Sequence, residues 1–331
     1  MFEANPTVVD RIARRAQSRP SRGKGRRLSV AAAIMSLAAG ASGDAAAPGH
    51  VTGAPAPVTA SDILVNDNHD LFLVRPDGTN RRRLTRVGDI GGASFSPDRS
   101  KIVLSRSYDS GYSDLFMMRS DGSDMTRLTY THGVGEEQPR WSPDGSQIVL
   151  NRWSNADLPI EGIVVMAPRP GARPRNVFHE NASVPGCSDP AYNSPVWSPT
   201  RMEIAVVANC FGDAGSTSVI VLTRPTGGIT KVLRLSPTMS HGLTYDPAGD
   251  QLAAMSELGL FRINHATGKR TRVTTYGYAS SPEWSPDGQW IAYSKYEDSS
   301  SSDVRAVRPD GSNDRLVLSS DSEWGAWPTD W

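Results

Sequence analysis

The sequence predicts an all-β fold, a six-bladed β-propeller of four-stranded antiparallel blades. Six times an aromatic residue ends a short apolar stretch, at successive spacings of 46, 56, 48, 39 and 47 residues. A period of about 40 to 50 residues built from strands and turns is typical of propellers. Asp-Gly pairs between apolar runs indicate tight hairpins, and no stretch after residue 61 keeps a helical periodicity. The aromatic residues that mark the repeat are Phe95, Trp141, Trp197, Tyr245, Trp284 and Trp331.

Each repeat follows one order of four strands, here called A to D. The aromatic residue ends strand A, and Ser-Pro-Asp-Gly follows it directly at Trp141 and Trp284. Pro at the second position and Gly at the fourth suit a type I turn. Strand B is a continuous apolar run such as 102–104, which is typical of a strand covered on both faces. Strand C leads to an Asp-Gly turn, as at 121–122, and a short strand D such as 127–129 completes the unit.

The two ends of the repeat region complement each other. Residues 62–86 supply strands B, C and D of a first blade without a strand A, and residues 324–331 supply a strand A with no strand B after it. We therefore expect the last strand to complete the first blade. Six landmarks then give six blades, and this closure removes sheet edges that would otherwise be open to pairing with other chains.

The first 47 residues have the layout of a secretory signal. A basic run ends at Arg26-Arg27, and an apolar run of 14 residues, 28–41, precedes small residues. This order is that of a signal peptide, and the run is shorter than the roughly 20 residues that span a bilayer. The paired arginines resemble a twin-arginine export signal. An uncleaved anchor is the alternative and would make the chain a sensor ectodomain. Residues 48–60, rich in Pro, Ala, Gly and Thr, are expected to form a flexible leader.

The charge balance gives no sign of nucleic-acid binding. The chain has 35 basic and 35 acidic residues, and residues 1–47 hold eight of the basic and three of the acidic ones. The remaining 27 basic and 32 acidic residues give the repeat region a net charge near −5. Proteins that bind nucleic acid usually carry a basic patch or stripe. No nucleic-acid partner is therefore expected. Together with the signal-like segment, the repeats predict an exported, extracytoplasmic protein that is a monomer. Residues 61–331 would form a single propeller, with no membrane span in the mature chain.

The repeat resembles that of TolB-like propellers, which belong to the wider WD40-like group. The shared signature is Pro-x-Trp-Ser-Pro-Asp-Gly, which stands here at 139–145 and 282–288, with Asp-Leu-Phe at 70–72 and 114–116. The resemblance covers residues 62–331 and implies the propeller fold, which hosts many functions. TolB itself has an additional amino-terminal domain that has no counterpart here. Similar repeats occur in prolyl-oligopeptidase-type peptidases and oligogalacturonate lyases, but the Gly-x-Ser-x-Gly motif of the peptidases is absent.

Recurrence separates structural residues from candidate site residues. Asp70, Asp114 and Asp303 recur at the start of strand C, which favours a structural role in the hairpins. The Pro-Asp-Gly turns likewise lie on one face, the turn face. The loops from D to A and from B to C share the opposite face, the loop face. These loops vary between blades, and variable loops on a rigid scaffold usually carry recognition.

Counting back four residues from each aromatic landmark predicts the mouth of the central channel on the loop face. The mouth candidates are polar or small, and three of them offer metal-ligating atoms. Carboxylate and imidazole groups suit several divalent ions, so Glu137, Asn193 and His241 give a manganese site as the alternative to a water-filled polar mouth. No cofactor is expected otherwise. The five positions are Gly91, Glu137, Asn193, His241 and Ser280.

Blade 4 differs from the other repeats in its loops. Cys187 lies in the loop that leads into this blade, and Cys210 follows its strand B, so both fall on the loop face. We expect a disulfide, which would close a loop of 24 residues and contribute about 3 kcal/mol. The alternative is two free thiols. The rim aromatics predicted to contact a ligand are Tyr112, Trp153, Tyr192 and Phe211.

Two functional hypotheses follow from these residues. The first is a non-enzymatic binding module that recognises a protein or a glycan through its loop face. The alternative is a polysaccharide lyase or another carbohydrate-active enzyme with its site at the channel mouth. A convergent acid–base or metal cluster at the mouth would favour the enzyme, and Glu137 with His241 forms only part of such a cluster.

Overall fold

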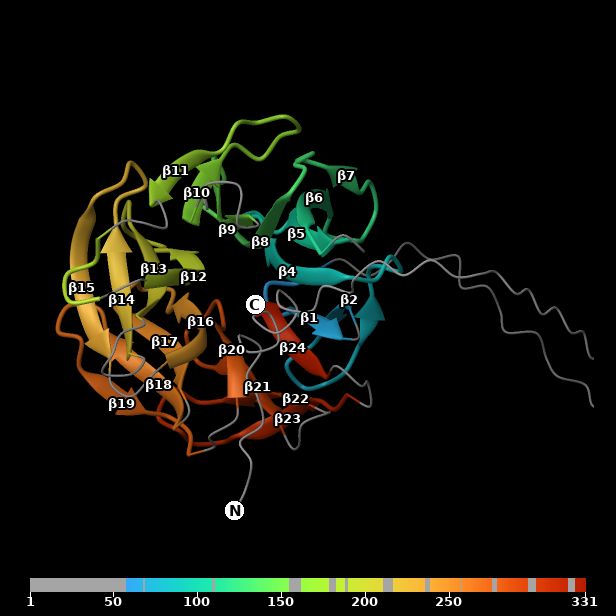
Figure 1. Ribbon diagram of the computed structural model, residues 1–331. Helices are drawn as coiled ribbons and strands as arrows, with labels where there is room; N and C mark the ends of the chain where they lie inside the picture. Colours follow the sequence, from blue (N-terminus) through green and yellow to red (C-terminus); the bar gives the residue numbers. More distant parts are fainter. Residues whose placement is uncertain are drawn as a thin grey trace, which may run out of the picture. The chain divides into compact units, whose positions relative to one another are not determined.

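The computed structural model shows an all-β chain whose strands form a ring of six blades (Figure 1). No helix among the described residues is long and apolar enough to cross a membrane. Phe211 and the predicted signal segment 1–47 lie outside the described residues. The structure describes residues 58–331, apart from 68, 109–110, 155–161, 179–182, 188–189, 211–216, 236–238, 257, 276–278, 297–301 and 321–324.

Each blade is a four-stranded antiparallel sheet, with the aromatic-bearing strand innermost. Blade 1 consists of β24 (Ala326–Asp330), β1 (Ile63–Asp67), β2 (Asp70–Val74) and β3 (Arg82–Arg83), and blade 2 of β4 (Ile90–Phe95), β5 (Lys101–Ser107), β6 (Ser113–Arg119) and β7 (Thr126–Arg127). Blade 3 consists of β8 (Val134–Trp141), β9 (Ile148–Ser154), β10 (Gly162–Met166) and β11 (Arg175–Phe178), and blade 4 of β12 (Pro190–Trp197), β13 (Ile204–Cys210), β14 (Thr217–Thr223) and β15 (Ile229–Leu235). Blade 5 consists of β16 (Met239–Tyr245), β17 (Gln251–Ser256), β18 (Gly259–Asn264) and β19 (Arg270–Arg272), and blade 6 of β20 (Ala279–Trp284), β21 (Ile291–Tyr296), β22 (Ser302–Val307) and β23 (Arg315–Leu318).

The last strand closes the ring, as the sequence predicts. Strand β24 pairs antiparallel with β1, and Asn66 stands opposite Trp327. The indole N–H of Trp331 donates to the carbonyl of Ser61 at 2.9 Å, and the hydroxyl of Thr329 donates to the carbonyl of Leu64 at 3.2 Å. The carboxyl-terminal strand is therefore an integral part of blade 1.

The core lies between neighbouring blades and is built from the apolar strands B and C. Because successive side chains of a strand point to opposite faces, a radial blade buries both faces against its two neighbours. The continuous apolar runs in the sequence follow from this arrangement. The first core residues of the five strands B that follow an aromatic landmark are fully buried, namely Ile102, Ile148, Ile204, Leu252 and Ile291.

The Ser-Pro-Asp-Gly segments form tight turns held by their own side chains. In blade 3, the hydroxyl of Ser142 donates to Asp144 at 2.6 Å, and the N–H of Gly145 donates to the carbonyl of Ser142 at 2.9 Å. Gly145 has a φ of 70°, a conformation that glycine adopts without steric cost. In blade 2, the Ser96 hydroxyl and the Ser100 backbone lower the pKa of Asp98 to about 2. These contacts support a structural role for the turn face.

The recurring aspartates of strand C fasten the outer hairpins. Asp70 accepts hydrogen bonds from Arg83 at 2.5 Å and from the Thr85 hydroxyl at 2.7 Å. Asp114 accepts equivalent bonds from Arg127 and Thr129 in blade 2. The same arrangement in two blades agrees with the structural role expected from their recurrence.

Candidate functional site

The predicted mouth residues share one backbone feature. In five blades, the pairing between the inner strand A and strand B contains a register shift. Each shift lies at or next to the predicted mouth position, four residues before the aromatic landmark. Gln138, Ser194 and Ser281 then adopt φ values of 53°, 52° and 52°, and Gly242 adopts 88°. Such β-bulges redirect side chains and are frequent at functional sites. The predicted mouth is thus a ring of bulged backbone.

Neighbouring inner strands are joined through these bulges. The N–H of Ser194 donates to the Gln138 amide oxygen at 2.7 Å, and the N–H of Gly242 donates to the Ser194 hydroxyl at 3.1 Å. This chain of bonds links β8, β12 and β16. A Cβ atom at Gly242 would lie 2.4 Å from the Pro282 ring. Strands β16 and β20 are therefore too close here for any residue other than glycine.

Below the mouth, an arginine crosses the channel. Arg140 of β8 pairs with Glu283 of β20, and these strands belong to blades 3 and 6, which lie opposite each other in the ring (Figure 1). Arg140 also donates to the carbonyl of Thr329 at 2.6 Å and lies 3.7 Å from the carboxylate of Asp330. These contacts bridge opposite blades across the centre of the ring and narrow the channel at this level.

Burial controls the electrostatics of this crossing. Glu283 is only 4% exposed, and its burial raises its pKa to about 8 against the attraction of Arg140, with the Asp330 carboxylate adding to the increase. One guanidinium faces two carboxyl groups here, so a proton on Glu283 brings the three groups to neutrality. The cluster therefore holds a proton that an exposed glutamate would release.

The mouth residues take different environments. Burial raises the pKa of Glu137, and a hydrogen bond with Trp153 acts in the opposite direction. The amide oxygen of Asn193 accepts from Ser194 at 3.0 Å, and the Ser280 hydroxyl lies 3.1 Å from the Tyr296 hydroxyl. His241 belongs to β16, but its side chain is outside the described part of the structure. In that part, no three His, Cys, Asp or Glu side chains gather as metal ligands do, and the manganese site stays a hypothesis.

Two predicted rim aromatics, Tyr112 and Trp153, come together. Their ring centroids lie 5.7 Å apart, and the contact joins blade 2 to blade 3. Gly135 makes room for the indole, because a Cβ atom there would lie 2.2 Å from Trp153 Cε2. The Ser113 hydroxyl donates to the carbonyl of Glu136 at 2.9 Å and holds the two blades in register beside the rings.

Tyr192 lies apart from this pair. Its ring stacks on Phe178 with centroids 5.4 Å apart and planes 4° apart. It is 7% exposed and belongs to the core between blades 3 and 4, and burial raises its pKa to about 12. Tyr192 therefore contributes packing, whereas Tyr112 and Trp153 are only partly buried.

Sequence reasoning missed three residues of the surface around Tyr112 and Trp153. Tyr130 is 66% exposed, and the guanidinium of Arg127 lies 4.5 Å from its ring centroid and 5.2 Å from that of Tyr108. The backbone N–H of Tyr108 donates to the carbonyl of Tyr112 at 2.8 Å, which continues the surface to the Tyr112–Trp153 pair. The sequence did contain a signal for this surface, because Tyr108 and Tyr130 lie in two loops of blade 2 that share the loop face. We define the blade 2–3 aromatic surface as Tyr108, Tyr112, Arg127, Tyr130 and Trp153.

Comparison with known proteins supports the fold at low sequence identity. No protein family model matches the chain, and no curated protein matches it in sequence. Among solved structures, it is similar to TolB from Acinetobacter baumannii, with a TM-score of 0.60, 15% identity, and coverage of 82% of this chain and 66% of TolB. In its fold, the chain is a TolB-like six-bladed β-propeller.

Two further solved structures are similar to this chain. A chain of the nidogen/laminin complex matches with a TM-score of 0.62 and 14% identity, over 80% of this chain and 97% of that one. Oligogalacturonate lyase in complex with manganese matches with a TM-score of 0.50 and 16% identity, over 71% and 70%. At these identities the likeness extends to the fold alone.

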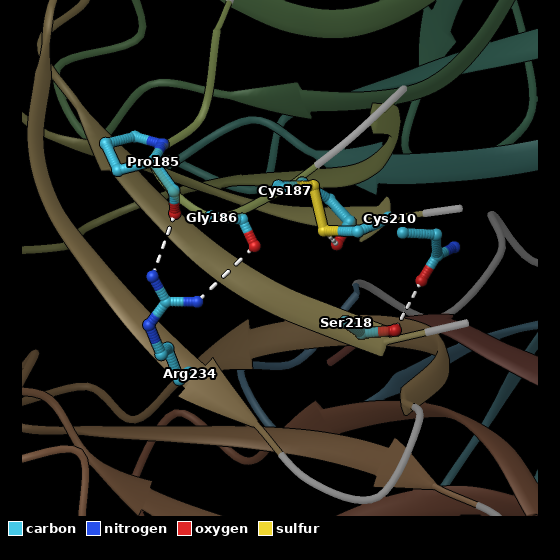
Figure 2. Close-up of a disulfide and its surroundings, with 8 residues drawn as sticks. Pro185, Gly186, Cys187, Cys210, Ser218 and Arg234 are labelled. Atoms are coloured by element: carbon cyan, nitrogen blue, oxygen red, sulfur yellow. Dashed lines mark hydrogen bonds between the residues drawn. A yellow bond between two sulfur atoms is a disulfide. The ribbon is translucent and has the colours of Figure 1, made fainter. Parts of the chain in front are cut away.

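The propeller carries the predicted disulfide on blade 4. Cys187 and Cys210 are bonded, with Cα atoms 5.0 Å apart (Figure 2). Beside Cys187, Val184 is 1% exposed and inserts into the core between blades 3 and 4. Both contacts fix the loop that leads into blade 4. A disulfide is compatible with an extracytoplasmic location, because such bonds persist in oxidising compartments.

Proposed function

We propose that this propeller is an exported scaffold that binds a protein partner through the blade 2–3 aromatic surface. The observation that carries the proposal is the composition of this surface, in which Arg127 contacts Tyr108 and Tyr130, Tyr112 contacts Trp153, and a backbone hydrogen bond from Tyr108 to Tyr112 joins the two groups. Tyr, Trp and Arg are the residues most enriched at the energetic centres of protein interfaces. A ring as exposed as that of Tyr130 is available for such a contact.

The narrowed channel favours a partner that binds on the rim. Arg140 and Glu283 meet across the channel from opposite blades, so an inserted segment would have to displace a buried hydrogen-bonded pair. The indole of Trp153, which packs on Tyr112, forms a hydrogen bond with Glu137 at the mouth. A partner can thus contact the rings and the polar mouth together without entering the channel.

The comparisons and the sequence give secondary support. One similar chain comes from a complex of two proteins, nidogen and laminin, and propellers commonly serve as scaffolds for binding. The signal-like segment and the disulfide support export. Recognition of a glycan in place of a protein, and lyase activity at the mouth, are the competing proposals.

Site-specific photocrosslinking tests the proposal. A photoreactive phenylalanine derivative is placed at Tyr130, and in a matched control at Met202, which is 71% exposed on the turn face. Discrete protein adducts in the source cells are expected at position 130 and not at 202. Adducts at both positions or at neither would contradict the proposal. Release of unsaturated uronides from polygalacturonate with manganese added would favour the lyase instead.

A further inference from the structure

The outermost strand of blade 4 is unusually long. Strand β15 has seven residues, whereas the outer strands β3, β7, β11, β19 and β23 have two, two, four, three and four. Propellers normally leave only short outer edges, because a long free edge invites pairing with other chains. In the described part of the chain, β15 pairs with β14 and with no other strand.

The free edge of β15 is flanked by apolar side chains on both faces. Val232 packs on the core between blades 3 and 4, and Leu233 is 5% exposed in the core between blades 4 and 5. Alternate residues of an edge strand direct their N–H and C=O groups away from the sheet. The strand thus offers ordered backbone donors and acceptors on an apolar support.

The two cations of β15, Lys231 and Arg234, bind backbone carbonyls on opposite faces of blade 4. The Lys231 ammonium donates to the carbonyls of His265, at 3.0 Å, and Ala266 in blade 5. The Arg234 guanidinium donates to the carbonyls of Pro185 at 3.0 Å and Gly186 at 3.4 Å (Figure 2). Lysine and arginine protect an edge when they stand over it. Here backbone carbonyls on opposite faces hold them aside.

The disulfide supports one of these two contacts. Pro185 and Gly186 directly precede Cys187, which is bonded to Cys210 at the end of β13. The carbonyls that hold Arg234 are therefore fixed to the blade by a covalent bond.

We propose that the edge of β15 is a second binding surface, where an extended, acidic segment of another protein adds a strand to blade 4. Main-chain hydrogen bonds give the affinity in such strand addition, and alternate side chains give the specificity. On each face of β15, one apolar residue packs into the neighbouring core and one cation stands beside it, namely Val232 with Arg234 and Leu233 with Lys231. The fitting segment therefore alternates apolar residues with Asp or Glu.

Charge argues against a second copy of the chain as the occupant. Antiparallel pairing of two β15 strands would bring Lys231 and Arg234 of one copy beside those of the other. Like charges on neighbouring strands are destabilising. An acidic segment turns the same positions into favourable cross-strand pairs.

A synthetic peptide in which valine alternates with glutamate and threonine tests this surface. Fluorescence anisotropy should show saturable binding, and hydrogen exchange at alternate amides of residues 229–235 should slow by about tenfold or more. The same peptide with N-methyl groups at alternate amides should not bind, since it cannot form the ladder. No binding at about 1 mM peptide, equal binding of the N-methylated peptide, or binding without protection of β15 would overturn the proposal.

A charge exchange supplies the matched variants. The double change Lys231→Glu with Arg234→Glu should weaken binding of the glutamate peptide by about tenfold or more and strengthen binding of a peptide with lysine in its place. Arg270→Glu on the short exposed strand β19 should change neither. The proposal would be overturned if the double variant and Arg270→Glu changed peptide binding equally. It would also be overturned if light scattering showed dimers joined through β15.

Discussion

Arg140 and Glu283 meet across the central channel from inner strands that lie three blades apart. Each stands directly before an aromatic landmark, Trp141 and Trp284. Asp330, directly before Trp331, completes the group. The position before the landmark therefore points to the axis, and the charges chosen there narrow the channel.

Removing Arg140 should destabilise the propeller strongly. Arg140→Ala leaves the Asp330 carboxylate without its cation and Glu283 without its hydrogen-bond partner at the channel crossing, and removing one partner of such a buried pair typically costs about 3–5 kcal/mol. Urea unfolding followed by tryptophan fluorescence measures the loss. The control is Arg119→Ala, because Arg119 and Asp124 form a pair whose side chains are 67% and 69% exposed. That variant should lose no more than about 1 kcal/mol, and equal losses would show that the channel pair is not special.

The same cluster should make stability depend on pH. The folded-state pKa of Glu283 is raised to about 8, so the folded chain binds this proton more tightly than the unfolded chain does. Stability from this group is therefore fully present at low pH and declines as the pH rises from the unfolded pKa, about 4.3, to the folded value. Glu283→Gln mimics the protonated group and should flatten this part of the pH profile of the unfolding free energy. Profiles of equal slope in the two proteins would contradict the raised pKa.

Loss of the disulfide should destabilise blade 4. The bond joins residues 23 positions apart, and the chain-entropy estimate for such a loop is about 3 kcal/mol. Changing Cys187 and Cys210 to serine together should lower the urea midpoint, and reductant should lower it equally in the unaltered protein. Reductant should have no effect on the double variant. An unchanged midpoint in both experiments would show that Val184 and its neighbours anchor the loop alone.

A methyl group at Gly135 should break up the aromatic surface. The added Cβ atom would meet Trp153 at 2.2 Å, so the indole must leave its place and its contact with Tyr112. We expect Gly135→Ala to shift Trp153 fluorescence and to weaken partner binding. The control is Gly171→Ala, because a Cβ atom there meets no atom within 4 Å. It has a φ of 68°, so it reports backbone strain without displacing a ring.

Much of the fold could be predicted because its signals are local and repeated. The aromatic landmarks, the Asp-Gly turns and the continuous apolar runs each specify strands and turns within one blade. Ring closure followed from simple complementarity between residues 62–86 and 324–331. The disulfide followed from the common face of Cys187 and Cys210. Each of these inferences needs only the strand order within a repeat.

The candidate site was harder to predict because it depends on the bulges and on the order of blades around the ring. The pairing of Arg140 with Glu283 joins residues 143 positions apart, and it becomes visible only when opposite blades are known. Tyr192 illustrates the effect of alternation, since the side chain beside the mouth residue Asn193 points between blades into the core. Tyr130 and Tyr108 converge on Arg127 only because two loops of blade 2 meet on one face.

The dissociation constant of the crosslinked partner tests the proposed role of the loop face most directly. Calorimetry would compare the unaltered chain with Tyr130→Ala and with Met202→Ala, the exposed residue of the turn face. A binding surface centred on Tyr130 predicts at least about a tenfold increase of the dissociation constant, or about 1.4 kcal/mol, for Tyr130→Ala. It predicts no change for Met202→Ala. Equal affinity of all three proteins, or a loss confined to Met202→Ala, would contradict binding through the blade 2–3 aromatic surface.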